Sequence, residues 1–142
     1  MPVVLFVRMA LNAIDGMLAR EHNMQSALGG FLNELTDVVA DAALYLPLAL
    51  VAGVDGVYVV LIILLATISE LAGVVSVQVG GSRRYDGPMG KSDRAFVFGA
   101  ICLLLGLKVE PGVWLDLVLI ATLVLLTLTI VNRVRRGLAE VN

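Results

Sequence analysis

The chain has 142 residues, of which 59% are hydrophobic and only 15% are charged. Soluble domains carry about 45–50% apolar and about 25% charged residues, so this composition favours a membrane protein over a soluble one. The net charge is −2, no stretch supports nucleic-acid binding, and the single cysteine excludes an intramolecular disulfide. The length suits one domain, and we expect a single membrane-embedded domain over residues 1–142.

Apolar segments long enough to cross a hydrocarbon core as helices occur five times along the chain, some of them only just long enough. They run from about Pro2 to Ala19, Gly29 to Val54, Val57 to Val79, Asp93 to Leu107 and Val113 to Val131. The fourth needs a polar first turn beginning near Lys91 to reach across. We therefore expect an all-α, polytopic membrane helix bundle of about five spans. Because the first segment barely spans, we also expect that a preceding helix is missing from this chain.

The basic residues predict the orientation of this bundle. If the spans alternate in direction, all but one of the arginines and lysines outside the first segment fall on one side, and only Lys108 falls on the other. The positive-inside rule places the basic side in the cytoplasm. We expect an integral protein of a bacterial inner (cytoplasmic) membrane, with its site facing the cytoplasm. The residues on that side are Arg20, Arg83, Arg84, Lys91, Arg94, Arg133, Arg135 and Arg136.

Polar side chains interrupt the first two apolar segments at helical spacing. Ionisable residues at membrane depth are costly and usually face a site or a water-filled cavity. Both segments meet the cytoplasmic boundary near residues 21–28, so they predict an antiparallel helix pair whose polar faces oppose each other. The residues are Arg8, Asn12 and Asp15 in the first segment, and Asn33, Glu34, Asp37 and Asp41 in the second.

These acids and amides predict a site for a hard divalent cation. Oxygen ligands without cysteine or histidine suit Mg²⁺ or Mn²⁺, and the natural further ligands of such an ion are phosphate oxygens. Gly16 and Ala19 are small enough to let a ligand approach the helix backbone, and Arg20 can clamp a phosphate with its planar fork. The alternative is that the polar groups only hold helices together through ion pairs and close packing.

The spacing of these residues resembles the signature of the class I CDP-alcohol phosphatidyltransferase family, D-x2-D-G-x2-A-R-x8-G-x3-D-x3-D. The matching residues are Asp15, Gly16, Ala19, Arg20, Gly29 and Asp37. Two positions depart from the signature, because Asn12 and Asn33 stand where the family has its first and third aspartates. The resemblance identifies a divergent member, and the six spans usual in the family agree with a missing first helix.

The resemblance implies roles for the residues at the signature positions. In the family the aspartates bind a divalent metal, and the last one is taken as the base that deprotonates the acceptor hydroxyl. Asp15 would then be a metal ligand, and Asp37 a ligand or the catalytic base. Asn12 and Asn33 would ligate through their carbonyl oxygens without adding negative charge. The remaining matches would contact the substrate, namely Gly16, Ala19, Arg20 and Gly29.

Further candidates lie outside the signature. Our hypothesis is that Glu34 and Asp41 restore the charge lost at the two asparagines, Glu34 as a metal ligand and Asp41 as a second catalytic base. The loop containing Lys91 and Arg94 resembles a basic cytoplasmic loop of the family. Lys91 and Arg94, with Arg83 and Arg84 as further candidates, would hold the acceptor's phosphate or lipid headgroups. That loop has the alternative role of only setting the topology. We expect Glu70, in the third segment, to pair with one of these bases.

The resemblance implies transfer of a phosphatidyl or phosphoalcohol group from a CDP-linked donor (CDP-diacylglycerol or a CDP-alcohol) to a hydroxyl acceptor, with release of CMP, in phospholipid synthesis. The expected partners are the CDP-linked substrate and membrane lipids, and a homodimer is compatible with them. The two asparagines keep a second interpretation open, a catalytically impaired relative that binds nucleotide or lipid or partners another membrane enzyme. An ion or proton carrier is disfavoured, because the five short spans show no repeat symmetry.

Overall fold

The computed structural model describes residues 27–142, and every element in this range is helical. Helix α2 covers Ala27–Tyr45, the short 3-10 helix η1 Leu46–Leu50, α3 Gly56–Gln78, α4 Lys91–Gly106 and α5 Val113–Val141. The predicted all-α fold is therefore confirmed for this part of the chain. The first apolar segment lies outside the described residues, together with Asn12, Asp15, Gly16, Ala19 and Arg20.

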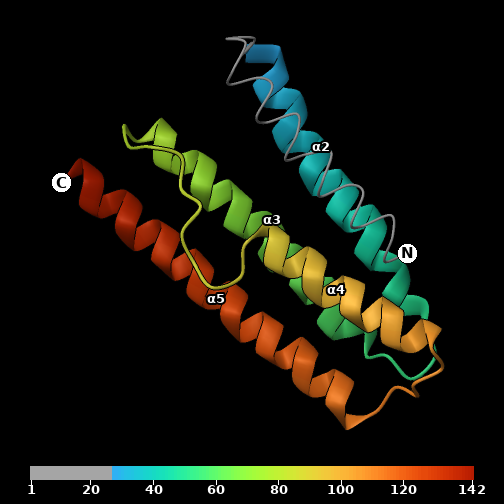
Figure 1. The fold of residues 1–142 in the computed structure, drawn as a ribbon. Helices are drawn as coiled ribbons and strands as arrows, with labels where there is room; N and C mark the ends of the chain where they lie inside the picture. The colour runs from blue at the N-terminus through green and yellow to red at the C-terminus, as the bar shows by residue number, and fades with distance from the viewer. Residues whose placement is uncertain (1–26) are drawn as a thin grey trace.

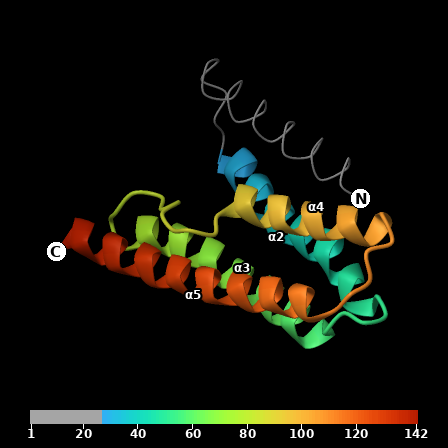
Figure 2. The same ribbon diagram turned by 60° about the horizontal axis from the view of Figure 1, so that its bottom comes forward.

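The helices alternate in direction along the chain (Figure 1). Helices α3 and α5 run the same way and lie side by side over most of their length, while α2 and α4 run the opposite way (Figures 1 and 2). The loop of residues 79–90 turns back at the end of α3 and follows the bundle before α4 begins, so that α4 starts partway along α3 (Figure 1). This return path brings the basic loop against the helices.

A narrow stripe of each long helix forms the α3–α5 seam. The buried residues of α3 repeat at alternating steps of three and four, and α5 follows nearly the same rhythm. Such a repeat keeps one side of a helix against its partner. Toward the C-terminal ends of both helices, Ser76 and Gly137 allow a close approach, since a Cβ at Gly137 would clash with Ser76 Oγ. The outward sides stay apolar, as hydrocarbon surroundings require, with Leu64, Leu71, Val124 and Leu128 all exposed.

Sequence and structure differ most clearly at the ends of two helices. The second segment was expected to run to Val54, but α2 ends at Tyr45 and η1 follows. Pro47 explains this difference, because a proline has no backbone N–H to continue the helix. Helix α5 continues ten residues past the predicted end at Val131. Helix α4 begins at Lys91, as the polar first turn predicts, and the backbone N–H of Gly90 donates to Asp93 Oδ2 at 2.8 Å.

Within residues 27–142, α3 and α5 are the helices that are both long and apolar enough to cross a membrane. Helix α2 carries three acids, and α4 has only 16 residues. At about 1.5 Å per residue, α4 would span about 24 Å, less than a typical hydrocarbon core. The crossings by α2 and α4 therefore stay predictions.

Among the contacts that hold the returning loop against α5, one brings the two backbones close together. The backbone N–H of Met89 donates to Thr129 Oγ1 at 2.9 Å. Gly87 has a φ of +131°, and a Cβ there would lie 2.7 Å from Thr129 Cα. Both the backbone angle and the close approach require glycine at this position.

Replacing Gly87 with alanine should therefore destabilise the protein by about 1–3 kcal/mol, because the loop must leave α5 or adopt a strained backbone. Thermal unfolding of the purified protein in detergent measures this change. Gly106→Ala is the matched control, since a Cβ at Gly106 meets nothing within 4 Å. Equal stability of the two variants would contradict the tight contact.

Candidate active site

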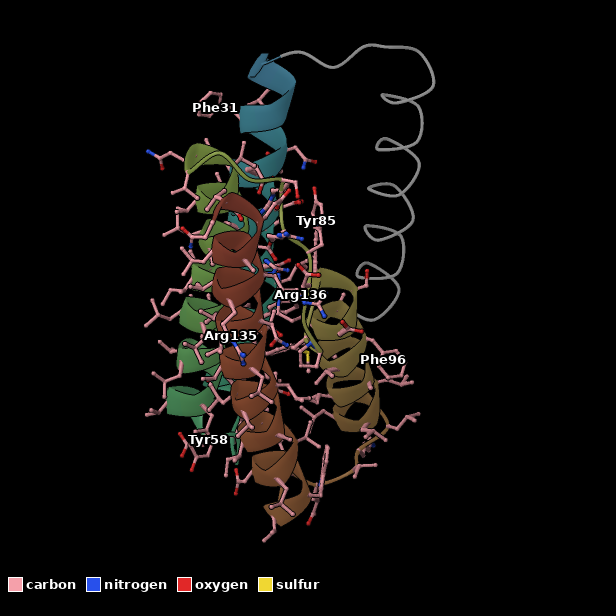
Figure 3. The ribbon with its side chains drawn as sticks, turned by 90° about the vertical axis from the view of Figure 1, so that its left-hand side faces the viewer. Phe31, Tyr58, Tyr85, Phe96, Arg135 and Arg136 are labelled. Atoms are coloured by element: carbon pink, nitrogen blue, oxygen red, sulfur yellow. The ribbon has the colours of Figure 1, made fainter. Side chains whose placement is uncertain are left out.

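A cleft of about 290 Å³ opens where α2, the second half of α3, the 79–90 loop, the start of α4 and the second half of α5 converge. Figure 3 shows Tyr85 of the loop above the start of α4, toward the end of the bundle that carries Phe31, whereas Tyr58 lies at the opposite end. The side chains lining the cleft are mostly polar and carry both signs of charge. They include Asn33, Glu34, Asp37, Glu70, Arg83, Tyr85, Lys91, Asp93 and Arg133.

Asp37 is joined to the first residue of α4. The ammonium group of Lys91 forms an ion pair with Asp37 Oδ1, and both side chains are half-buried. Asn33 lies one helical turn before Asp37 and lines the same cleft. Of the residues predicted to act in the site, Asn33, Asp37 and Lys91 are therefore brought together.

Glu34 meets the returning loop through a two-point contact. Arg83 Nε donates to Glu34 Oε1 at 3.1 Å, and Arg83 Nη2 donates to Glu34 Oε2 at 2.8 Å. The Arg83 guanidinium also lies over the ring of Tyr85, 5.1 Å from its centroid. Paired in this way, the Glu34 carboxylate is occupied by a cation of the protein itself, and its role as a metal ligand stays a prediction.

Arg94 lies beneath the cleft between two acids. Its side chain is 1% exposed, and its Nη2 donates to Asp41 Oδ2 at 3.1 Å and to Glu70 Oε1 at 3.0 Å. Asp41 is itself only 6% exposed. Both residues line a small cavity with space for about one water, and neither lines the cleft. Arg94 was predicted to bind substrate and Asp41 to act as a second base, and both roles stay predictions for this buried pair.

Glu70 joins the buried pair to the cleft. Its carboxylate contacts Arg83, Arg94 and Arg133, so the expected pairing with a base of the loop is confirmed. From the sequence, Arg133 is predicted only to help set the orientation of the bundle in the membrane. In the structure, Arg133 also lines the cleft. Its position could have been found from the α5 stripe, because Leu126, Thr129 and Arg133 continue one buried face.

Comparison with known proteins identifies the family of the chain. A family model described as CDP-alcohol phosphatidyltransferase matches residues 2–131. The chain belongs to this family. Inner membrane protein YnbA of Escherichia coli (strain K12) is 43% identical to it over 135 residues, which cover 95% of this chain and 67% of that protein. No solved structure matches the chain at a significant level.

Membership in the CDP-alcohol phosphatidyltransferase family agrees with the composition and the apolar helices, and the chain is a membrane protein. The chemistry of the family is the transfer of a substituted phosphate group from a CDP-alcohol. The part of its signature that the structure describes comprises Gly29 in the first turn of α2, Asn33 and Asp37. Asn33 and Asp37 line the cleft, whereas Gly29 does not.

Family members generally use divalent metals, and the donor atoms available here are oxygens that suit such an ion. In the described part of the chain, no three histidine, cysteine, aspartate or glutamate side chains are placed to hold a metal. Asn33 and Asp37 are the predicted ligands that line the cleft beside the paired Glu34. The other two, Asn12 and Asp15, lie outside the described residues.

Replacing Arg94 with methionine should cost about 3–5 kcal/mol, because it removes the buried cation that bridges the carboxylates of Asp41 and Glu70. Thermal or denaturant unfolding in detergent measures the loss. Arg135→Met is the matched control, since Arg135 is exposed on α5 (Figure 3). A methionine variant at position 94 as stable as the control would show that the buried pair contributes nothing to folding.

Proposed function

We propose that the chain transfers a phosphatidyl or phosphoalcohol group from a CDP-linked donor to a hydroxyl acceptor and releases CMP. The observation that carries this proposal is the position of Asp37, the last acid of the family signature, in a cleft lined by Arg83, Lys91 and Arg133. A carboxylate can accept the proton of an attacking hydroxyl, and neighbouring cations can stabilise negative charge on phosphate oxygens.

The reaction then follows from these roles. The acceptor oxygen forms a bond to the phosphorus distal to cytidine, the bond from that phosphorus to the CMP oxygen breaks, and the hydroxyl proton passes to Asp37. Lys91, paired with Asp37, holds that carboxylate toward the start of α4. The guanidinium groups of Arg83 and Arg133 supply positive charge for the phosphate oxygens. A divalent ion held by Asp15, Asp37, Asn12 and Asn33 would add neutralisation of the diphosphate.

A membrane-embedded cleft suits such a pair of substrates. A nucleotide diphosphate is strongly anionic and needs water and cations, whereas diacylglycerol chains need apolar surroundings. The cleft has a charged lining, and the sides of α3 and α5 that face away from the bundle are apolar. The name of the Escherichia coli relative supports an inner-membrane location, and the basic residues at this end of the bundle support a cytoplasmic opening.

The second candidate is a catalytically impaired relative that binds nucleotide or lipid or partners another membrane enzyme. Asn12 and Asn33 favour it, because each replaces a family aspartate and removes one negative charge from the site. Such a protein would bind CDP-linked lipid without releasing CMP.

Metal-dependent release of CMP separates the two candidates. We expect the purified chain in vesicles to release CMP from CDP-diacylglycerol or a CDP-alcohol when Mg²⁺ or Mn²⁺ and a panel of hydroxyl acceptors are present, and to stop when a chelator is added. Asp37→Asn should lower the rate by about 100-fold or more, as loss of a general base does. Asp116→Asn, in the first turn of α5 at the opposite end, should leave the rate unchanged. Tight nucleotide binding without CMP from any donor would favour the impaired relative.

The orientation is testable by labelling single cysteines. In a Cys102→Ala background, Lys108→Cys should react with a membrane-impermeant maleimide in intact cells. Arg135→Cys, at the basic end of α5, should react only after the membrane is opened. The reverse pattern of labelling would show that the bundle has the opposite orientation in the membrane and that the cleft does not open to the cytoplasm.

A further inference from the structure

One carboxylate, that of Glu70, gathers three arginines from three different segments. Its Oε1 accepts from Arg94 Nη2 at 3.0 Å. Its Oε2 accepts from Arg83 Nη2 at 3.2 Å and from Arg133 Nη1 at 3.3 Å. The three cations come from the 79–90 loop, α4 and α5. Two of them, Arg83 and Arg133, line the cleft together with Glu70.

The backbone of α3 reinforces this arrangement. The carbonyl oxygen of Glu70 accepts from Arg83 Nη1 at 3.0 Å, and the carbonyl oxygen of Ser69 accepts from Arg133 Nη1. Gly73, one turn after Ser69, leaves room for the Arg83 side chain, since a Cβ there would lie 2.6 Å from the carbonyl oxygen of Arg84 as well as against the guanidinium. Backbone carbonyl oxygens in the second half of α3 therefore bind the guanidinium groups of both Arg83 and Arg133.

The three arginines differ in what else neutralises them. Arg83 also pairs with Glu34, and Arg94 also pairs with Asp41. For Arg133, Glu70 is the one carboxylate within ion-pair distance among residues 27–142, and its remaining hydrogen bonds go to backbone carbonyl oxygens of Ser69 and Asp86. Arg133 is 2% exposed, so its side chain depends on Glu70 more than the other two do.

We propose that Glu70 is a positioning residue that holds Arg83 and Arg133 at the cleft, so that the site is preorganised to receive a phosphate group. This inference rests on the proposed function of the cleft. Three guanidinium groups near one another repel, and without the shared carboxylate they would separate into different rotamers. A phosphate would then have to order them at the moment of binding, which lowers affinity.

The direction in which phosphate affinity changes in a Glu70 variant shows whether Glu70 positions the arginines or only neutralises their charge. Glu70→Gln keeps the shape of the side chain but removes a negative charge beside the cleft. If Glu70 only neutralised charge, inorganic phosphate would bind the variant more tightly, because the cleft would become more positive. If Glu70 positions the arginines, phosphate should bind about tenfold more weakly in spite of the added positive charge.

The test is the dissociation constant of inorganic phosphate for the full chain in detergent, measured by calorimetry for wild type and variants. Glu140→Gln is the matched control, because Glu140 binds Arg84 and Ser82 of the same loop but does not line the cleft. Glu70→Asp retains the charge with a shorter reach, so it should also bind phosphate more weakly than wild type, and it decides the matter if Glu70→Gln does not fold. Wild-type or tighter affinity in Glu70→Gln, or full wild-type affinity in Glu70→Asp, would overturn the inference.

The same measurements separate this inference from the proposed function. Release of CMP by a wild-type chain that binds no phosphate would overturn the role of Glu70 and leave the transferase function standing. Phosphate binding that is weakened by Glu70→Gln, in a chain that releases no CMP from any donor, would support the role of Glu70 and remove the transferase function.

Discussion

Pairing of charges in apolar surroundings is the constraint on which the rest of this structure depends. Three acids on one stripe of α2 each meet a base from another segment. Glu34 pairs with Arg83 of the loop, and Asp37 and Asp41 pair with Lys91 and Arg94 of α4. An unpaired charge in a low-dielectric environment is costly, so each acid fixes the position of its partner. Two of these pairs, Glu34–Arg83 and Asp37–Lys91, lie in the lining of the cleft.

Hydrophobic packing supplies the frame for these ion pairs. The α3–α5 seam buries a narrow stripe of each helix, while the outward sides stay apolar and exposed. Near the basic end, small residues replace the larger ones of the seam, and the space they leave is taken by the returning loop. Gly73 makes room for Arg83, and Gly87 lies against Thr129. The same seam therefore holds the bundle together at one end and receives the charged loop at the other.

Periodicity in the sequence predicted which faces carry the charges but not which charges meet. The stripe of Glu34, Asp37 and Asp41 follows from helical spacing, and all three acids face basic partners. The partners themselves depend on the path of residues 79–90, which no local pattern specifies. Helix ends were missed where a single residue decides them, as Pro47 does for α2. Arg133 was missed as a cleft residue because α5 was expected to end at Val131, before its buried stripe reaches that position.

The matched stripe on α2 has an evolutionary consequence. Each of its three acids pairs with a base on another segment, so replacing an acid weakens the hold on that base, and replacing the base leaves the acid with one cation fewer. The stripe should therefore drift in pairs, with a change on α2 accompanied by a compensating change in the loop or on α4. In related sequences, the acids of α2 and their basic partners should therefore covary, even where neither position is invariant.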